Sequence, residues 1–267
     1  PSVAASRSPA TTPESHWRKF EKYLAELTAP EWLFRGHADV SWRLTPNVGR
    51  EDVLKTPWTA SGELDLLNEF KRRARQFEPG VGFDDWDWLA LAQHYGLPTR
   101  LLDWTYSPYV AMHFATYDAK LFDDDAAIWC VDYRKTNALL PRPLRRVLDH
   151  HDVNIFTTEL ISEVASSLAD FGRLGNDDFI VFFEPPSLDE RIVNQFALFS
   201  LPSSPDMPLE ALLNRNEGSY RRILIPAALK WEIRDKLDQA NITERVLFPG
   251  LDGLSAWLKR YFTTRQR

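Results

Sequence analysis

Hydrophobic residues recur at helical spacing in several segments of the chain. Leu160, Val164 and Leu168, for example, are each four residues apart and share one face of a helix. Thr12 and Ser107 are followed by proline, a combination typical of a helix cap and the first helical residue. The pattern predicts helices over 12–27, 63–77, 85–95, 107–117, 155–171, 229–237 and 254–262.

Short apolar runs between these segments indicate strands. They read EWLFRG at 31–36, TRLLDW at 99–104, AAIWCVDY at 126–133, FIVFFEP at 179–185, FALFSLP at 196–202 and RRILIP at 221–226. Helices and strands do not alternate strictly, and no Gly/Ser-rich linker divides the chain. We therefore predict one α+β domain over 12–267, with a small central mixed or antiparallel sheet flanked by helices. Residues 1–11 are expected to be a disordered leader or a vector-derived remnant.

Composition narrows the classes of protein that fit. The formal net charge of −6 disfavours binding of nucleic acid through charge alone. Cys130 is the only cysteine, and no histidines stand at metal-ligand spacing, so we expect no disulfide and no metal. There is no glycine-rich dinucleotide loop, no signal peptide and no apolar run long enough for a bilayer. A cytoplasmic protein without a membrane partner is the expectation.

The run HYGLPTRLLDWTYSPYVAMHFA, residues 94–115, mixes charged and apolar residues in an unusual way. Arg100 and Asp103 are three apart on a predicted strand and point to opposite faces, so each needs its own partner. Two interpretations are open: two buried salt bridges that fix the fold, or a rigid wall beside a ligand cleft. Trp104 is expected to face the core if Asp103 faces the cleft. His94 ends a helix, where a histidine commonly bonds a nearby carbonyl.

A second polar run, FRGHADVSWRLTPNVGR, spans residues 34–50. Arg35 follows an apolar stretch and precedes Gly36, which allows close approach of the backbone. A guanidinium there suits a phosphate or a carboxylate. The alternative is that Arg35 pairs with a carboxylate inside the fold, with Asp103 as the obvious partner.

These motifs together resemble the FRG-domain family, which is named for its Phe/Tyr-Arg-Gly motif. The resemblance rests on FRG at 34–36, on SWRLTP, and on the long run from Gln93 to Ala115, with RIVNQFALFS and LFPGLDGL as later blocks. It extends from about residue 31 to residue 258. The family resemblance alone does not imply an activity.

The order of strands and motifs also resembles the ADP-ribosyltransferase arrangement. That resemblance implies that Arg35 contacts NAD and that Thr105 and Ser107 shape the nicotinamide pocket. It also implies a late glutamate, which stabilises the ribosyl cation when the glycosidic bond breaks. Here RRILIP places Arg222 where that glutamate stands, and Tyr220 lies two residues earlier.

The missing glutamate leaves several alternatives open. Glu217 is close in sequence but out of register, and Gln195 is another candidate for the position. Asp103 or Glu184 could supply the negative charge, or the domain could bind its ligand without transfer.

We therefore expect an ADP-ribosyltransferase-like domain that uses or binds NAD, with a role as a toxin or defence effector. The alternative is a non-catalytic module that binds a nucleotide or ADP-ribose, and a purely structural domain ranks last. The acceptor, whether protein or nucleic acid, is left open. The predicted catalytic residues are Arg35, His94, Asp103 and Ser107. The predicted nucleotide contacts are Arg35, Gly36, Gln93, Thr99, Arg100, Thr105 and Gln195. Arg35, His94, Arg100, Asp103 and Ser107 are expected to converge on one cleft.

Overall fold

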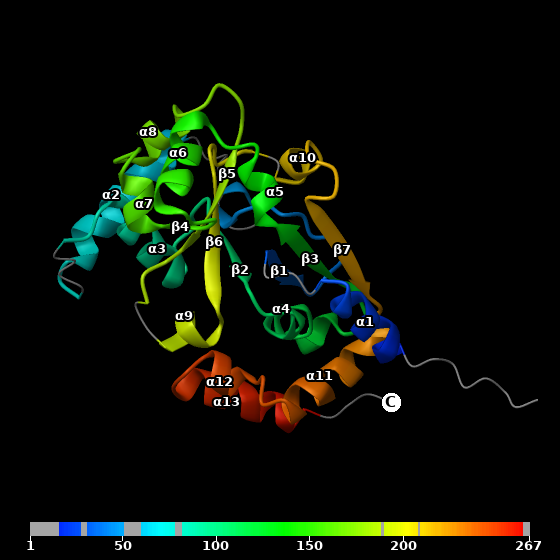
Figure 1. Cartoon of the computed structure of the whole chain (residues 1–267). Coiled ribbons are helices and arrows are strands. Elements are labelled where there is room, and N and C mark those ends of the chain that lie inside the picture. Colours follow the sequence, from blue (N-terminus) through cyan, green and yellow to red (C-terminus); the bar gives the residue numbers. More distant parts are fainter. Residues whose placement is uncertain are drawn as a thin grey trace, which may run out of the picture.

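The computed structural model describes residues 16–27, 31–50, 60–77, 82–187, 190–207 and 209–263. Over these residues the chain is an α+β structure with one mixed sheet flanked by helices, as predicted (Figure 1). The expected leader at 1–11 and the cap at Thr12 lie outside the described residues. No helix in the described ranges is long and apolar enough to cross a membrane.

The strands are β1 Trp32–His37, β2 Leu102–Thr105, β3 Ala126–Asp132, β4 Phe156–Thr157, β5 Ile180–Glu184, β6 Ala197–Pro202 and β7 Tyr220–Ile225. The helices of the first half are α1 His16–Ala25, α2 Ala60–Ala74, α3 Asp85–His94, α4 Pro108–Ala115, α5 Tyr133–Asn137 and α6 Arg142–His151. Those of the second half are α7 Thr158–Ser162, α8 Leu168–Gly172, α9 Glu190–Asn194, α10 Leu209–Leu213, α11 Lys230–Gln239, α12 Glu244–Leu247 and α13 Leu251–Tyr261. Three short 3-10 helices are η1 Asn47–Gly49, η2 Ala119–Leu121 and η3 Ala227–Leu229.

The sheet has the strand order β4-β5-β6-β2-β1-β3-β7. Each neighbouring pair is antiparallel except β4 and β5. The six strands predicted from apolar runs are all present, and β4 is the strand that the pattern missed. It has two residues, which is too short for alternation to reveal.

Apolar side chains fill both faces of the sheet. On one face, β5 and β6 pack against α2, α3, α6, α7 and α8, while β1, β3 and β7 pack against α4 and α11. On the other face, a third cluster joins Trp104 and Trp129 of the sheet to Leu44 and to α10. Trp104 is buried in this cluster, on the face opposite Asp103, as predicted.

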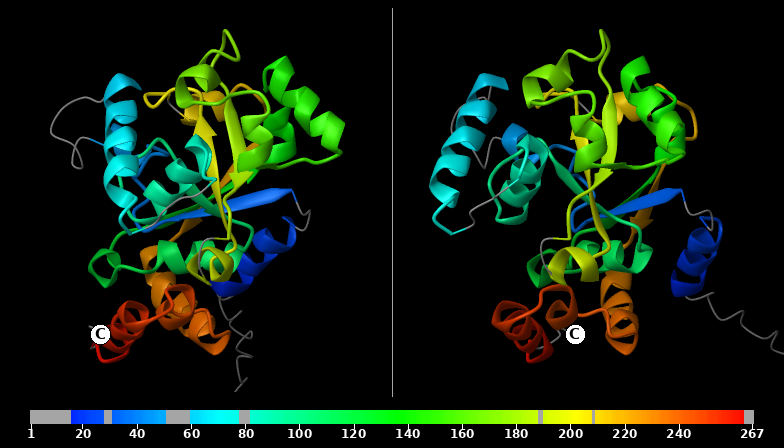
Figure 2. Two further views of the ribbon diagram at one scale, coloured as in Figure 1. Left: turned by 90° about the vertical axis from the view of Figure 1, so that its left-hand side faces the viewer. Right: turned by 60° about the vertical axis from the view of Figure 1, so that its left-hand side comes forward.

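The sheet is weakly joined between β1 and β2. Phe34 with Thr105 is the one register pair between these two strands, whereas β1 and β3 pair at every residue of β1. Beyond Phe34 the two strands separate. Figure 2 shows the blue strand β1 running across the direction of the yellow-green and yellow strands β5 and β6. The sheet thus consists of two halves joined by one register pair, and the interruption of the ladder that follows it, here called the gap, lies beside Arg35 and Asp103.

Gly36 brings β1 and α4 into close contact. A Cβ atom at Gly36 would lie 1.9 Å from the carbonyl oxygen of Ala111 and 2.7 Å from the backbone nitrogen of Ala115. Both are backbone atoms of a helix, so neither can move aside cheaply. Helix α4 is therefore the element that closely approaches the backbone at Gly36. No ligand is needed to explain why this residue is a glycine.

The predicted long helix at 155–171 is wrong. Residues 156–157 form β4, and two short helices, α7 and α8, follow. The hydroxyls of Thr157 and Ser167 accept hydrogen bonds from the first turns of α7 and α8, so each begins a new helix. The four-residue spacing of apolar residues thus persists across a break between helices, because the capping residues decide where each helix starts.

We predict that Gly36→Ala destabilises the protein by about 3 kcal/mol or more, because the added methyl group overlaps helix backbone. Gly49→Ala is the matched control, since its nearest neighbour would be the Thr45 methyl group at 3.3 Å. Urea unfolding measures both free energies. Equal stability of the Gly36→Ala variant and the wild type would contradict the packing described for β1 and α4.

Candidate functional site

Arg35 lies within β1, which continues to His37. The register places its side chain on the face opposite that of Asp103, yet its guanidinium reaches the gap between β1 and β2. There Nη1 donates a hydrogen bond of 2.6 Å to the backbone carbonyl of Asp103. This carbonyl belongs to the part of β2 that has no ladder partner on β1. Arg35 therefore joins the two halves of the sheet.

The same guanidinium has a carboxylate neighbour at longer range. Nη1 of Arg35 is 3.7 Å from Oδ2 of Asp103, and the two side chains are 15% and 60% exposed. Burial lowers the pKa of Arg35, an effect that the charge of Asp103 opposes and that of Arg50 strengthens. The predicted alternative of an Arg35–Asp103 pair is thus confirmed, but its carboxylate is largely exposed rather than buried.

His37 is a buried, neutral partner of Arg35. Its Nε2 accepts from Nε of Arg35 at 3.2 Å, and its Nδ1 lies 3.3 Å from the carbonyl oxygen of Trp42. These contacts assign the proton to Nδ1, which donates to that carbonyl. Burial and the charge of Arg35 lower the pKa of His37 to about 3. The histidine thus holds the arginine without competing with it as a cation.

Asp103 is held in place by a chain of polar side chains, here called the Asp103 network. Its Oδ2 accepts from Nε2 of Gln93 at 3.0 Å, and Oε1 of Gln93 accepts from the Thr99 hydroxyl at 2.7 Å. The Thr99 oxygen accepts in turn from the backbone N–H of Leu101. Gln93 and Thr99 are buried. The network fixes a carboxylate that remains open to solvent, which is what a binding group requires.

Two further arginines act on this region. Nε of Arg50 donates to the Thr45 carbonyl, and Arg222 of β7 donates to the Val40 carbonyl while its guanidinium stacks 5.0 Å from the centre of the Trp129 ring. The charges of both lower the pKa of His37. We call Arg35, Arg50 and Arg222 the arginine cluster.

In the region of the arginine cluster, positive charge exceeds negative charge. Asp103 is the acid whose charge acts on Arg35 in the described part of the chain. Arg35 is paired with Asp103, the charge of Arg50 acts on Arg35 and His37, and that of Arg222 acts on His37, so positive charge around Arg35 and His37 favours an anion. Sequence reasoning found Arg35 and Asp103 but missed His37 and Arg50, although both stand in the run from 34 to 50. The sequence feature that could have identified these two residues is the density of polar residues in that run.

Arg100 is a structural residue, which corrects its assignment as a nucleotide contact. It donates from Nε and Nη2 to Glu63 of α2 at 2.8 and 2.6 Å, and both side chains are at most 3% exposed. Its Nη1 donates to the carbonyl of Ser203. The guanidinium therefore fastens α2 to β6 and is closed to any ligand. Of the two buried salt bridges considered, this one is confirmed.

The other predicted residues lie near β2 but have roles in packing. The Thr105 hydroxyl donates to the Gln195 carbonyl at 2.7 Å, and the Gln195 side chain donates to the Leu247 carbonyl at 2.9 Å. Ser107 caps α4, as predicted, by accepting from the Val110 N–H. His94 ends α3, next to Gln93, with its ring edge-on to Tyr95. The expected convergence therefore holds for Arg35 and Asp103, joined by Gln93 and Thr99.

Among the described contacts, Asp103 is the acid candidate that reaches the arginine cluster, whereas Glu184 is engaged elsewhere. Glu184 accepts from the Tyr106 hydroxyl at 2.7 Å, and burial raises the pKa of that phenol. Tyr220 stacks on Trp129 and donates its hydroxyl to Asn214. Of the candidates named from the sequence, Asp103 is the acid that contacts Arg35.

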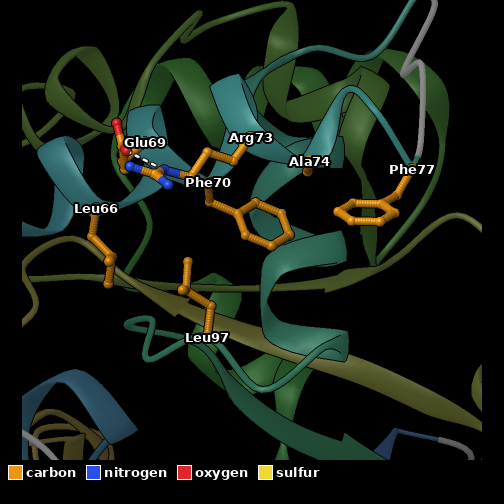
Figure 3. Close-up of a pocket in the computed structure, with 7 residues that line it drawn as sticks. All are labelled: Leu66, Glu69, Phe70, Arg73, Ala74, Phe77 and Leu97. Carbon is orange, nitrogen blue, oxygen red and sulfur yellow. Dashed lines mark hydrogen bonds and ion pairs between the residues drawn. The ribbon is translucent and has the colours of Figure 1, made fainter.

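A cavity of about 310 Å³ lies along α2, apart from these contacts. Its walls are mostly apolar (Figure 3), and they consist of Leu66, Glu69, Phe70, Arg73, Ala74, Phe77 and Leu97. None of the predicted site residues lines it. The five residues expected in one cleft therefore do not share this cavity. Among the described residues, no group of acids, histidines and cysteines is arranged to hold a metal.

The fold and these contacts define an α+β domain whose sheet opens beside an arginine cluster and a fixed carboxylate. Residues 30–124 match the family model of the FRG domain. The match includes Arg35, Arg50, the Asp103 network and α4, and it ends before β3. The later blocks read from the sequence lie beyond it. No curated protein and no solved structure matches the chain.

We predict that Arg100→Met destabilises the protein by about 3–5 kcal/mol, because it leaves the Glu63 carboxylate buried without a partner. The double variant Arg100→Met with Glu63→Leu should recover much of this loss, since no buried charge remains. Thermal and urea unfolding give the comparison. A single variant as stable as the wild type would contradict the structural role of Arg100.

We also predict that acid unfolding depends on His37. The pKa of His37 is about 3 in the folded chain and about 6.5 in the unfolded chain, so protonation favours unfolding. The stability that neutral His37 contributes is complete above pH 6.5 and is lost as the pH falls toward 3, at up to about 1.4 kcal/mol per pH unit. His113, whose pKa is also lowered to about 3, adds a second such slope.

The His37→Gln variant tests this dependence, because glutamine can accept from Arg35 and donate to Trp42 without titrating. Its free energy of unfolding should fall less steeply than that of the wild type between about pH 5 and 6.5, where most carboxylates stay ionised. Identical slopes for the two proteins would show that His37 is not buried as a neutral group.

Proposed function

We propose that this protein binds a nucleotide with a pyrophosphate, of the NAD or ADP-ribose type, at the arginine cluster. The observation that carries the proposal is that Arg35 lies at the gap in the sheet beside one fixed and exposed carboxylate, while the charges of Arg50 and Arg222 act on Arg35 or on its partner His37. The buried pair of Arg100 and Glu63, by contrast, neutralises itself and leaves no charge for a ligand. An anion with two negative charges supplies what the cluster lacks.

Arg35 is suited to contact the phosphates. Its Nε and Nη1 are held by His37 and by the Asp103 carbonyl, while Nη2 has no hydrogen-bond partner among the described residues. The guanidinium is thus oriented in advance and keeps a donor for a phosphate oxygen. Arg50 supplies further charge from the segment that follows β1, and Arg222 supplies it from β7.

Asp103 is suited to contact the sugar. The Asp103 network and Arg35 engage its Oδ2, and Oδ1 has no partner in the described parts of the chain. A carboxylate oxygen in this position can accept a hydrogen bond from a ribose hydroxyl, as acidic residues do in other nucleotide sites. One phosphate-binding group and one ribose-binding group on either side of the gap fit a single nucleotide.

A second candidate function, cleavage of NAD, is favoured by the same carboxylate. In that reaction the bond between ribose C1′ and the nicotinamide nitrogen breaks, and its electron pair leaves with nicotinamide. Water or another nucleophile then bonds to C1′ and loses its proton to solvent. A negative charge beside the sugar stabilises the cationic transition state. Asp103 is the acid at the cluster that can supply this charge.

The proposal is tested by calorimetric titration of ADP-ribose and NAD into the wild type and Arg35→Lys. Lysine keeps the charge but loses the planar fork of donors, so affinity should fall on the order of ten- to a hundredfold. Arg173→Lys is the matched control, because Arg173 is the C-cap residue of α8 and its side chain is 79% exposed. A wild type that binds neither compound at millimolar concentration would overturn the proposal.

Release of nicotinamide from NAD separates binding from cleavage. If Asp103 supplies the charge, the wild type releases nicotinamide, and Asp103→Asn loses that activity while its affinity for NAD changes only a few-fold. If the wild type binds ADP-ribose and releases no nicotinamide, the domain is a binding module. Activity that survives in Asp103→Asn would assign the chemistry to another acid.

A further inference from the structure

An exposed tryptophan lies beside the candidate site. Trp42 stands in the segment that follows β1 and is 45% exposed, whereas the other tryptophans among the described residues are buried or half-buried. An exposed indole is a flat apolar surface on which a planar ring can stack. What distinguishes Trp42 from a scattered apolar residue is its position next to the partner of Arg35, His37.

The segment that carries Trp42 is fixed on both sides of this residue. The backbone N–H of Val40 donates to the carbonyl of Asp125 at 2.7 Å, and that of Leu44 donates to Oε1 of Glu210 at 2.5 Å. The Leu44 side chain is buried in the core. Trp42 stands midway between these two anchors in the sequence. Its backbone is therefore held before a ligand arrives, which lowers the entropy that binding would cost.

The contacts of Arg35 give an order to the groups around it. Its Nη1 lies 3.7 Å from Oδ2 of Asp103, and its Nε donates to Nε2 of His37 at 3.2 Å. On the far side of the imidazole, Nδ1 of His37 lies 3.3 Å from the Trp42 carbonyl, and the two rings are edge-on with centres 6.1 Å apart. The donors of a planar guanidinium follow the order Nε, Nη2, Nη1. Nη2 of Arg35 thus lies between Asp103 and His37, and Trp42 follows His37.

We propose that Trp42 stacks on the adenine of the bound nucleotide, an inference that rests on the proposed function. In NAD and ADP-ribose a pyrophosphate joins two riboses, and one of these carries adenine. With the pyrophosphate on Nη2 of Arg35 and the other ribose on Asp103, the adenosine half extends toward His37 and Trp42. The base presents a π face that the indole meets. The ligand class is thus a nucleotide with its base attached, because pyrophosphate alone lacks this contact.

The test is calorimetric titration of ADP-ribose and of inorganic pyrophosphate into the wild type, Trp42→Leu and Trp42→Tyr. Loss of the indole should weaken the binding of ADP-ribose about tenfold or more and leave that of pyrophosphate unchanged. Tyrosine keeps an aromatic face, so Trp42→Tyr should restore most of the affinity. Phe77→Leu is the matched control, since Phe77 is an exposed aromatic residue at the apolar cavity along α2. Melting temperatures check that each variant is folded.

The outcomes separate this inference from the proposed function. If the wild type binds ADP-ribose and Trp42→Leu binds it equally well, the nucleotide site stands and the role of Trp42 is overturned. Equal losses for ADP-ribose and pyrophosphate, or no recovery in Trp42→Tyr, would show that Trp42 only supports His37 and Arg35, and would overturn it too. A loss in Phe77→Leu instead would place the base in the cavity. A wild type that binds neither compound would overturn both the proposed function and this inference.

Discussion

The hydrogen bond from Arg35 to the carbonyl of Asp103 joins the two halves of this sheet. Between β1 and β2 the ladder has one register pair, so the backbone beyond it needs another partner. A guanidinium is long enough to span the gap, and its planar set of donors reaches His37 as well. The residue that completes the sheet is therefore also the residue that presents charge at its opening.

This arrangement explains the chemistry of the neighbours. His37 is neutral because it is buried and accepts from a cation, and so it orients Arg35 without adding charge. Gly36 lets α4 lie directly on β1, which leaves the arginine to one side of the strand and the helix to the other. Asp103 stays exposed because Gln93, and not a buried cation, is its closest partner.

Much of the fold could be predicted from the sequence, because strong apolar runs and helix caps are local signals. Six strands and the helix capped by Ser107 were found this way. The break between α7 and α8 was missed, since the four-residue spacing of apolar residues continues across it while Thr157 and Ser167 start new helices. The two-residue strand β4 was missed because it is too short to show a period.

The site was predicted in part, for a related reason. Residue types identified Arg35 and Asp103 as charges that need partners, and the structure brings them together. The sequence could not show that Glu63, 37 residues earlier, neutralises Arg100, so Arg100 was wrongly assigned to the ligand. Nor could it show that Arg222 reaches the region from the far edge strand, because such a contact depends on the strand order.

A crystal structure with ADP-ribose bound tests the central claim most directly. The account predicts a pyrophosphate oxygen within hydrogen-bond distance of Nη2 of Arg35 and a ribose hydroxyl on Oδ1 of Asp103, with Arg100 still paired to Glu63. ADP-ribose bound in the apolar cavity along α2, or elsewhere with Arg35 untouched, would contradict it.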